Sequence, residues 1–164
     1  MKLGNSTRVA LVDLLKKGQL GPLKLGLSAD VVIDLCGPNY SVVPSFSREE
    51  DRILYYGRSP SGPLQIYLED ERVWGIEIDA LALPTQFSIP NLPRFELRRG
   101  FLGVDYLKRF MASNGISWTT TDERFGQVDL KTECGTRIWF DDGLLMEIQV
   151  FRDEMTNYRM QPLV

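Results

Sequence analysis

Histidine is absent from this 164-residue chain, and its absence removes several kinds of site at once. Without an imidazole the chain has no Ser-His or Cys-His nucleophile pair, no ordinary general base that titrates near neutral pH, and none of the commonest zinc ligand. Most familiar hydrolase sites are therefore excluded. Carboxylate pairs, lysine bases and metal sites built from Asp and Glu stay open as enzyme chemistry.

Cysteines and long apolar runs are also scarce. Cys36 and Cys134 lie far apart and lack the close spacing of a metal or redox motif, which favours structural thiols. No apolar run approaches the roughly 20 residues of a membrane-spanning helix, and the first residues do not form a secretory signal. We therefore expect a cytoplasmic protein that does not enter a membrane.

Positive charge is in slight deficit. The chain has 19 Lys and Arg against 22 Asp and Glu, which gives a net charge of −3 at pH 7. Nucleic-acid binding needs a basic face that displaces counterions from phosphates, so this composition argues against a nucleic-acid partner. A weakly acidic surface prefers a basic protein as its partner.

One sequence pattern occurs twice, at an offset of 72 to 75 residues. Residues 64–78 align without a gap on residues 136–150, and a helix-like run, 29–36 or 104–111, precedes each copy. The aligned copies share three residue pairs, Ile66/Ile138, Asp70/Asp142 and Ile76/Ile148. We predict one globular domain over residues 1–164. Its repeat halves span about 25–80 and 101–152, and a Pro-rich connection at 81–100 joins them.

The predicted fold class is α+β, with two tandem helix-plus-antiparallel-sheet repeats and an extra N-terminal helix near residues 6–17. Ser6 or Thr7 is the expected cap of that first helix. Asp142-Gly143 is typical of a tight type I′ hairpin turn. The pattern leaves open whether the two halves form one sheet or two. The expected core residues are Ile66, Leu68, Trp74, Ile76, Ile78, Ile138, Phe140, Met146, Ile148 and Val150.

Acidic clusters occur at both predicted hairpin turns, as Glu69-Asp70-Glu71 and as Asp141-Asp142. Such carboxylates are able to bind a divalent cation or to act as paired acids. Turn geometry and solvation explain the same residue types, and the alternating spacing of a calcium loop is missing. We therefore predict no metal, no cofactor and no catalytic residue here, and retain these acids as candidate partner-binding residues.

Two aromatic residues, Tyr67 and Trp139, occupy equivalent positions in the two copies. Both are expected on the strand face opposite Ile66 and Ile138, because successive strand residues point to opposite faces. If that face is open to solvent, the two rings form a candidate partner surface. If a helix or a second sheet covers it, they belong to the core, and the sequence does not decide between the two.

Part of the chain resembles a loose family of small bacterial proteins. The resemblance comprises residues 25–31, Gly37-Pro38, Tyr55-Tyr56-Gly57, the apolar alternation at 64–68 and the Val-x-Gly-Ile pattern at 73–76. These motifs cover about a third of the chain and consist mostly of turn and core residues. Some members of the family resemble immunity proteins of polymorphic toxin systems. The resemblance therefore implies a non-enzymatic protein that binds and neutralises a cognate toxin.

Two other functions stay open beside the immunity-type inhibitor. A homodimeric scaffold or regulatory protein would pair an edge strand with the same strand of a second copy. An enzyme that relies on carboxylates or lysines alone would need acidic side chains that converge in a deep pocket. The arrangement of the acidic and aromatic residues in space distinguishes these functions.

Overall fold

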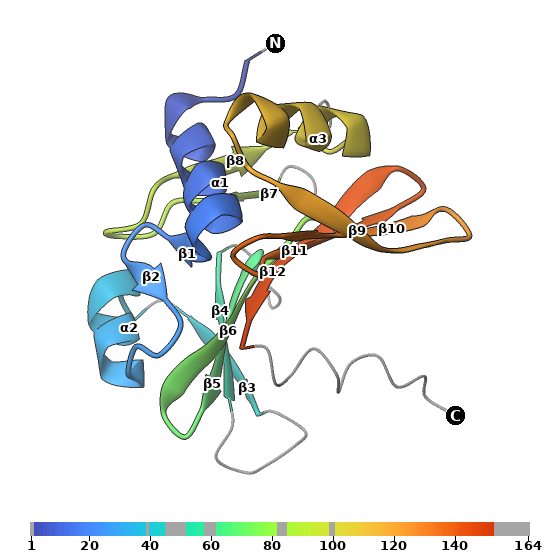
Figure 1. The fold of residues 1–164 in the computed structure, drawn as a ribbon. Coiled ribbons are helices and arrows are strands. Elements are labelled where there is room, and N and C mark those ends of the chain that lie inside the picture. The colour runs from blue at the N-terminus through green and yellow to red at the C-terminus, as the bar shows by residue number, and fades with distance from the viewer. Residues whose placement is uncertain are drawn as a thin grey trace, which may run out of the picture.

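A large antiparallel sheet forms one layer of the protein (Figure 1). The structure is a computed structural model that describes residues 2–38, 40–44, 52–57, 62–81, 85–98 and 101–152. Within these ranges, eight strands form one sheet in the order β3-β4-β5-β6-β12-β11-β10-β9. Their bounds are β3 Ser41–Pro44, β4 Arg52–Tyr56, β5 Leu64–Glu69, β6 Arg72–Asp79, β9 Trp118–Arg124, β10 Gln127–Thr132, β11 Arg137–Asp141 and β12 Leu144–Phe151.

The described helices and two small sheets lie on one side of this large sheet (Figure 1). The helices are α1 (Asn5–Lys17), α2 (Ala29–Cys36) and α3 (Val104–Ser113). The small sheets pair β1 (Gln19–Leu20) with β2 (Leu23–Lys24) and β7 (Thr85–Phe87) with β8 (Phe95–Leu97). Apolar side chains from the helices and from one face of the large sheet form a shared core. None of the described helices combines the length and the apolar character needed to span a bilayer.

The α+β class is confirmed, and the open question about the sheet is answered: both halves join one sheet. Each half contributes a helix followed by four strands, α2 with β3–β6 and α3 with β9–β12. The hairpins β5–β6 and β11–β12 pair in the same register at an offset of 72 residues. Both have a register shift at the same place, between Tyr67 and Leu68 and between Trp139 and Phe140. The duplication itself stays a prediction.

The two halves meet where β6 pairs with β12. Glu77 lies opposite Gln149, the residue at the equivalent position of the other half. The two strands are antiparallel, so replacing each residue by its equivalent in the other half gives the same set of strand pairs. The start of β6 therefore lies beside the end of β12, and the start of β12 beside the end of β6.

The register shifts explain two wrong core predictions. Trp74 and Met146 are half-buried, whereas the other predicted core residues are buried. In each hairpin the shift leaves one extra residue in the second strand. In β6, Val73 and Gly75 have direct partners on β5, whereas Trp74 between them has none. Met146 is the corresponding extra residue in β12. A bulged residue leaves the strict alternation of the strand, and a period-2 pattern does not locate it.

The Pro-rich connection at 81–100 contains a hairpin that the sequence pattern does not predict. Strands β7 and β8 pair Phe87 with Phe95, and these two rings stack at a centroid distance of 5.0 Å. Each strand is only three residues long and is surrounded by prolines, so the local pattern is too short to indicate a strand. Residues 82–84 and 99–100 of the connection lie outside the described residues.

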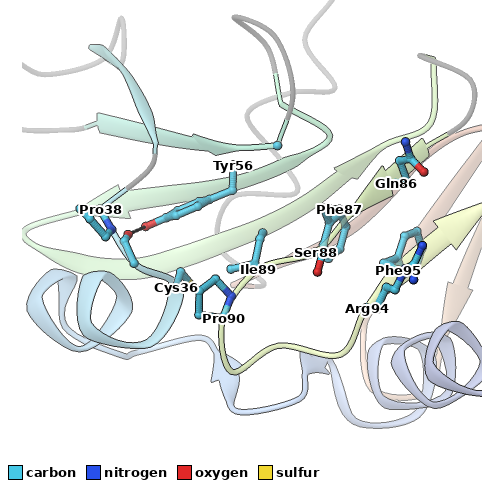
Figure 2. Close-up of a pocket in the computed structure, with 12 residues that line it drawn as sticks. Cys36, Pro38, Tyr56, Gln86, Phe87, Ser88, Ile89, Pro90, Arg94 and Phe95 are labelled. Atoms are coloured by element: carbon cyan, nitrogen blue, oxygen red, sulfur yellow. Dashed lines mark hydrogen bonds between the residues drawn. The ribbon is translucent and has the colours of Figure 1, made fainter.

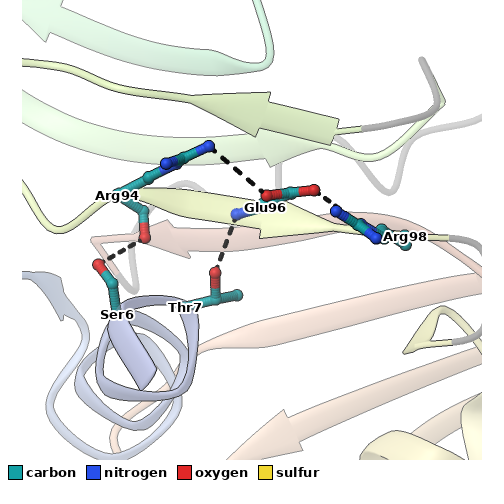
Figure 3. A network of polar contacts seen from close by, with 5 residues as sticks. All are labelled: Ser6, Thr7, Arg94, Glu96 and Arg98. Atoms are coloured by element: carbon teal, nitrogen blue, oxygen red, sulfur yellow. Dashed lines mark hydrogen bonds and ion pairs between the residues drawn. The ribbon is translucent and has the colours of Figure 1, made fainter. Parts of the chain in front are cut away.

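The N-terminal helix is confirmed, but its predicted cap is wrong. Gly4 is the N-cap residue, and no side chain of the described residues caps the helix. Instead, the Ser6 hydroxyl donates to the Arg94 carbonyl oxygen at 2.8 Å, and the Thr7 hydroxyl accepts from the Glu96 N–H at 3.0 Å (Figure 3). These hydroxyls therefore fasten α1 to β8, a strand almost ninety residues later in the chain.

Candidate functional site

The face of the sheet that points away from the helices carries polar and aromatic side chains. We call it the outer face. It consists of strand positions that alternate with the buried core, and its central members are Gln65, Tyr67, Glu77, Asp129, Arg137, Trp139, Glu147 and Gln149. The described helices and small sheets lie on the other side (Figure 1). Side-chain alternation along each strand therefore separates the apolar packing from a second, chemically different surface.

An acidic row crosses the outer face. Its members are cross-strand neighbours on five consecutive strands: Asp122 pairs with Asp129, Asp129 with Trp139, Trp139 with Glu147, and Glu147 with Asp79. Neighbouring strands lie about 4.8 Å apart, so each side chain of the row is next to the following one. The strand register thus places one indole ring between carboxylates that are far apart in the sequence.

Four members of the acidic row line a hollow of about 320 Å³. Gln127, Arg137 and Gln149 line it as well. Arg137 forms an ion pair with Oδ2 of Asp129, and Arg124 pairs with Asp122 at 3.0 Å. The walls are therefore charged and polar, with carboxylates in excess, and the half-buried Trp139 is the aromatic member.

Asp129 is the most constrained group of this hollow. Only 8% of the residue is exposed. Among the buried side-chain nitrogen and oxygen atoms of the described residues, its Oδ1 alone has no hydrogen-bond partner. A buried carboxylate oxygen without a donor is unfavourable, because the hydrogen bonds that water gave it have not been replaced. A ligand with an N–H donor would supply the missing bond.

A hydrogen-bond network continues from the hollow across the centre of the outer face. The Gln149 side-chain amide donates to Glu147 at 2.5 Å and to Glu77 at 3.1 Å. The Tyr67 hydroxyl lies 3.1 Å from both Glu77 Oε2 and Gln65 Oε1. This network holds the amides and carboxylates of the two half-sheets in fixed orientations where the halves meet.

Rings fill the outer face of the first half. Tyr67, Trp74 and Phe151 contact one another with centroid distances of 5.2 to 5.3 Å. The Phe151 ring lies directly over Gly75, where a Cβ atom would come within 2.2 Å of it. Tyr67 is consequently only 5% exposed, whereas its equivalent Trp139 borders the hollow. Of the two rings that the sequence singled out, Trp139 is the one available to a ligand.

The acidic turn residues do not join this site. Because β6 and β12 are antiparallel, the turn at Glu69-Asp70-Glu71 and the turn at Asp141-Asp142 lie at opposite ends of the central strand pair. Asp70, Glu71 and Asp142 have φ angles of 49°, 57° and 47°, as tight hairpin turns require. Glu71 also pairs with Arg52 at 2.5 Å. Their geometry is that of turn residues, and the seven candidate residues do not form one cluster.

Sequence reasoning missed Asp129, Glu147 and Gln149. They lie inside strands whose alternating polar residues are typical of a solvent-facing side of a sheet. The residues next to them in the sequence do not indicate that they are neighbours of Trp139. Among the described residues, no three Cys, Asp or Glu side chains come together as ligands of a metal ion.

A second, more apolar cavity of about 480 Å³ lies between the end of α2, β4 and the β7–β8 hairpin (Figure 2). Burial raises the pKa of the Cys36 thiol to about 11 and also raises the pKa of Tyr56, whose hydroxyl donates to the Gly37 carbonyl oxygen at 3.1 Å. Both groups are therefore neutral at physiological pH. Arg94 lies at the rim, where its largely exposed guanidinium faces Glu96 at 3.8 Å (Figure 3).

Comparison of the chain with models of protein families, with curated proteins and with solved structures gives no match. What the protein binds must therefore be inferred from its own surfaces. The outer face is the stronger basis for that inference, because it combines a hollow, excess carboxylate charge, an accessible indole ring and a buried oxygen without a partner.

Proposed function

We propose that this protein is a non-enzymatic, immunity-type inhibitor that binds a basic surface of a cognate toxin through its outer face. The observation that carries the proposal is the acidic row, in which Asp129 and Glu147 flank Trp139 on neighbouring strands. Carboxylates attract and orient a basic partner, and a central Trp is among the residues that most often carry binding energy at interfaces.

Complementary charge makes a toxin that acts on nucleic acid a suitable target. Such an enzyme needs a basic cleft to hold phosphates. The lining of the hollow contains three carboxylates, Asp122, Asp129 and Glu147, against Arg137 as its basic residue. An inhibitor with this surface would compete with the phosphates for the same basic groups, and its carboxylates would raise the rate of association.

We also propose that the two halves are copies of one unit that have since diverged. The equal registers of the β5–β6 and β11–β12 hairpins and the matching position of their register shifts support this. Under this proposal, the rings around Phe151 stabilise the first copy at the place where the second copy keeps a hollow beside Trp139. One copy would then serve mainly the fold and the other recognition.

Affinity purification from the native host tests the inhibitor function. The tagged protein is compared with Glu147→Lys on the outer face and with Asp34→Lys, an equal charge change at an exposed position of α2. We expect a heterologous protein to be recovered with the wild type and with Asp34→Lys, and to be lost with Glu147→Lys. Thermal unfolding of each variant checks that the change acts on binding.

The recovered protein must also behave as a toxin. Expressed alone in a test bacterium it should arrest growth, and co-expression of this protein should restore growth. Recovery of nothing except further copies of the chain, or of a protein whose expression is harmless, would count against the inhibitor function.

A homodimer is the second candidate, because β9 forms one edge of the sheet and its residues are mostly exposed. Two features act against strand pairing at this edge: the register shift beside Asp129 and the charged residues Asp122, Glu123 and Arg124 at the end of the strand. Sedimentation over a wide concentration range distinguishes a dimer from a monomer.

A further inference from the structure

We infer that the hollow on the outer face is a binding site for a guanidinium group, the side chain of an arginine on the partner protein. This inference rests on the proposed function and specifies which group of the partner is recognised. It is carried by Asp129, Trp139 and Glu147, which come from three neighbouring strands and form a carboxylate–indole–carboxylate series.

The geometry of this series suits a flat cation. Each strand spacing is about 4.8 Å, so the backbones that carry the two carboxylates are on the order of 10 Å apart, with the indole ring between them. A guanidinium that stacks on the ring is attracted by its π-electrons and directs its N–H groups outward in one plane. Those N–H groups then point toward the carboxylates on either side.

Asp129 supplies the strongest reason for a ligand with N–H donors. Its Oδ2 is already paired with Arg137, which shows that a guanidinium fits against this carboxylate. Its Oδ1 has no hydrogen-bond partner among the described residues and has less than 1 Å² exposed. Asp129 lines the hollow, so a donor bound there reaches Oδ1 once a neighbouring side chain moves aside.

Arginine is favoured over the other cations that carboxylates attract. A lysine ammonium presents a compact charge and does not stack as a plane. A metal ion would need several ligands at one point, and within the described residues no three Cys, Asp or Glu side chains come together in that way. The equivalent place in the first half is filled by Phe151 over Gly75, so the inference concerns the second half alone.

Binding of N-acetyl-arginine amide, followed by NMR, tests the inference on the intact protein. The chain has three tryptophans, so three indole N–H signals are expected, and Trp139→Phe identifies one of them. We expect that signal to shift saturably with the arginine probe. N-acetyl-citrulline amide, which has nearly the same shape without the charge, should bind at least about tenfold more weakly, as the loss of a charge-assisted hydrogen bond implies.

Variants locate the binding within the hollow. Asp129→Asn should weaken the arginine probe by about tenfold or more. Glu147→Gln should also weaken it and changes neither member of the Asp129–Arg137 pair, which makes it the second test if Asp129→Asn fails to fold. Asp34→Asn on α2 is the matched control, with the same loss of charge, and should bind like the wild type.

Three results would overturn the inference: equal affinity for the arginine and citrulline probes, wild-type affinity in both outer-face variants, or no movement of the Trp139 signal. Free L-arginine that binds more tightly than the blocked amide would contradict a protein side chain as the source. Loss of probe binding in Asp129→Asn with unchanged recovery of the toxin would contradict this site and leave the inhibitor function standing. Probe binding without any recovered toxin would contradict that function instead.

Discussion

Substitution of Gly75 by alanine tests how tightly the outer face of the first half is packed. A Cβ atom at this position would lie 2.2 and 2.3 Å from two carbons of the Phe151 ring, far inside van der Waals contact. The ring has little freedom to withdraw, because it contacts Tyr67 and Trp74 at centroid distances of 5.2 Å. We therefore expect the alanine to displace the ring and to weaken both aromatic contacts.

The size of the effect follows from these contacts. Each aromatic pair contributes about 0.5–1.5 kcal/mol, and the replacement of a strand glycine by alanine returns about 0.5–1 kcal/mol. The net loss in the free energy of unfolding should be about 1–2 kcal/mol, within the usual range for an overpacked site. For a chain of this length, that corresponds to a fall of roughly 2–8 °C in Tm.

A double-mutant cycle gives the decisive measurement. Urea and thermal unfolding are compared for the wild type, Gly75→Ala, Phe151→Ala and the double variant. Without the Phe151 ring the new methyl group has no steric clash, so Gly75→Ala should be neutral or slightly stabilising in the Phe151→Ala background. An equal cost of Gly75→Ala in both backgrounds would refute the proposed packing.

Three further predictions concern the core and the thiols. Thr136→Val should lower the free energy of unfolding by about 1 kcal/mol, because the buried hydroxyl donates to the Leu14 carbonyl oxygen at 2.6 Å. Urea unfolding measures this loss, and Thr119→Val at an exposed position is the control. An equal loss in the two variants would contradict the role of this bond. At pH 8, Ellman's reagent should label the exposed Cys134 rapidly and Cys36 only after unfolding. A rapidly reacting thiol that persists in Cys134→Ser would show that Cys36 is accessible. Burial raises the pKa of the Cys36 thiol from 9.0 to about 11, so as the pH rises this thiol ionises in the unfolded chain before it ionises in the folded protein. The stability that the neutral thiol contributes should therefore be lost between pH 9 and 11. Urea midpoints across that window should fall less steeply for Cys36→Ala; parallel curves would contradict the shift.

Local signals predicted the helices and the hairpins β5–β6 and β11–β12. Ser28 caps α2 and Gly37 ends it, as their residue types indicate, and the positive φ angles of Asp142 and Gly143 agree with the turn that this pair predicts. Each of these features depends on residues within a few positions of one another. Residue type alone did not give the burial of every position in α2, because the apolar Val31 is 45% exposed while Cys36 is buried.

Features that depend on distant residues were not predictable in the same way. The bulges that turn Trp74 and Met146 out of the core arise from pairing between strands, and the β7–β8 hairpin is held by Ser6 and Thr7 of α1. The strand propensity of a residue and the two-residue alternation of a strand contain no information about which distant segment pairs with it.

The sequence by itself determined the α+β class, the turn residues and the position of Trp139 on a face opposite the core. Only the tertiary structure decided that both halves join one sheet and that Asp129 and Glu147 flank that ring. The physical reason is strand register. It is set by hydrogen bonds between segments far apart in the chain, and a shift of one residue would have turned these carboxylates to the other face of the sheet.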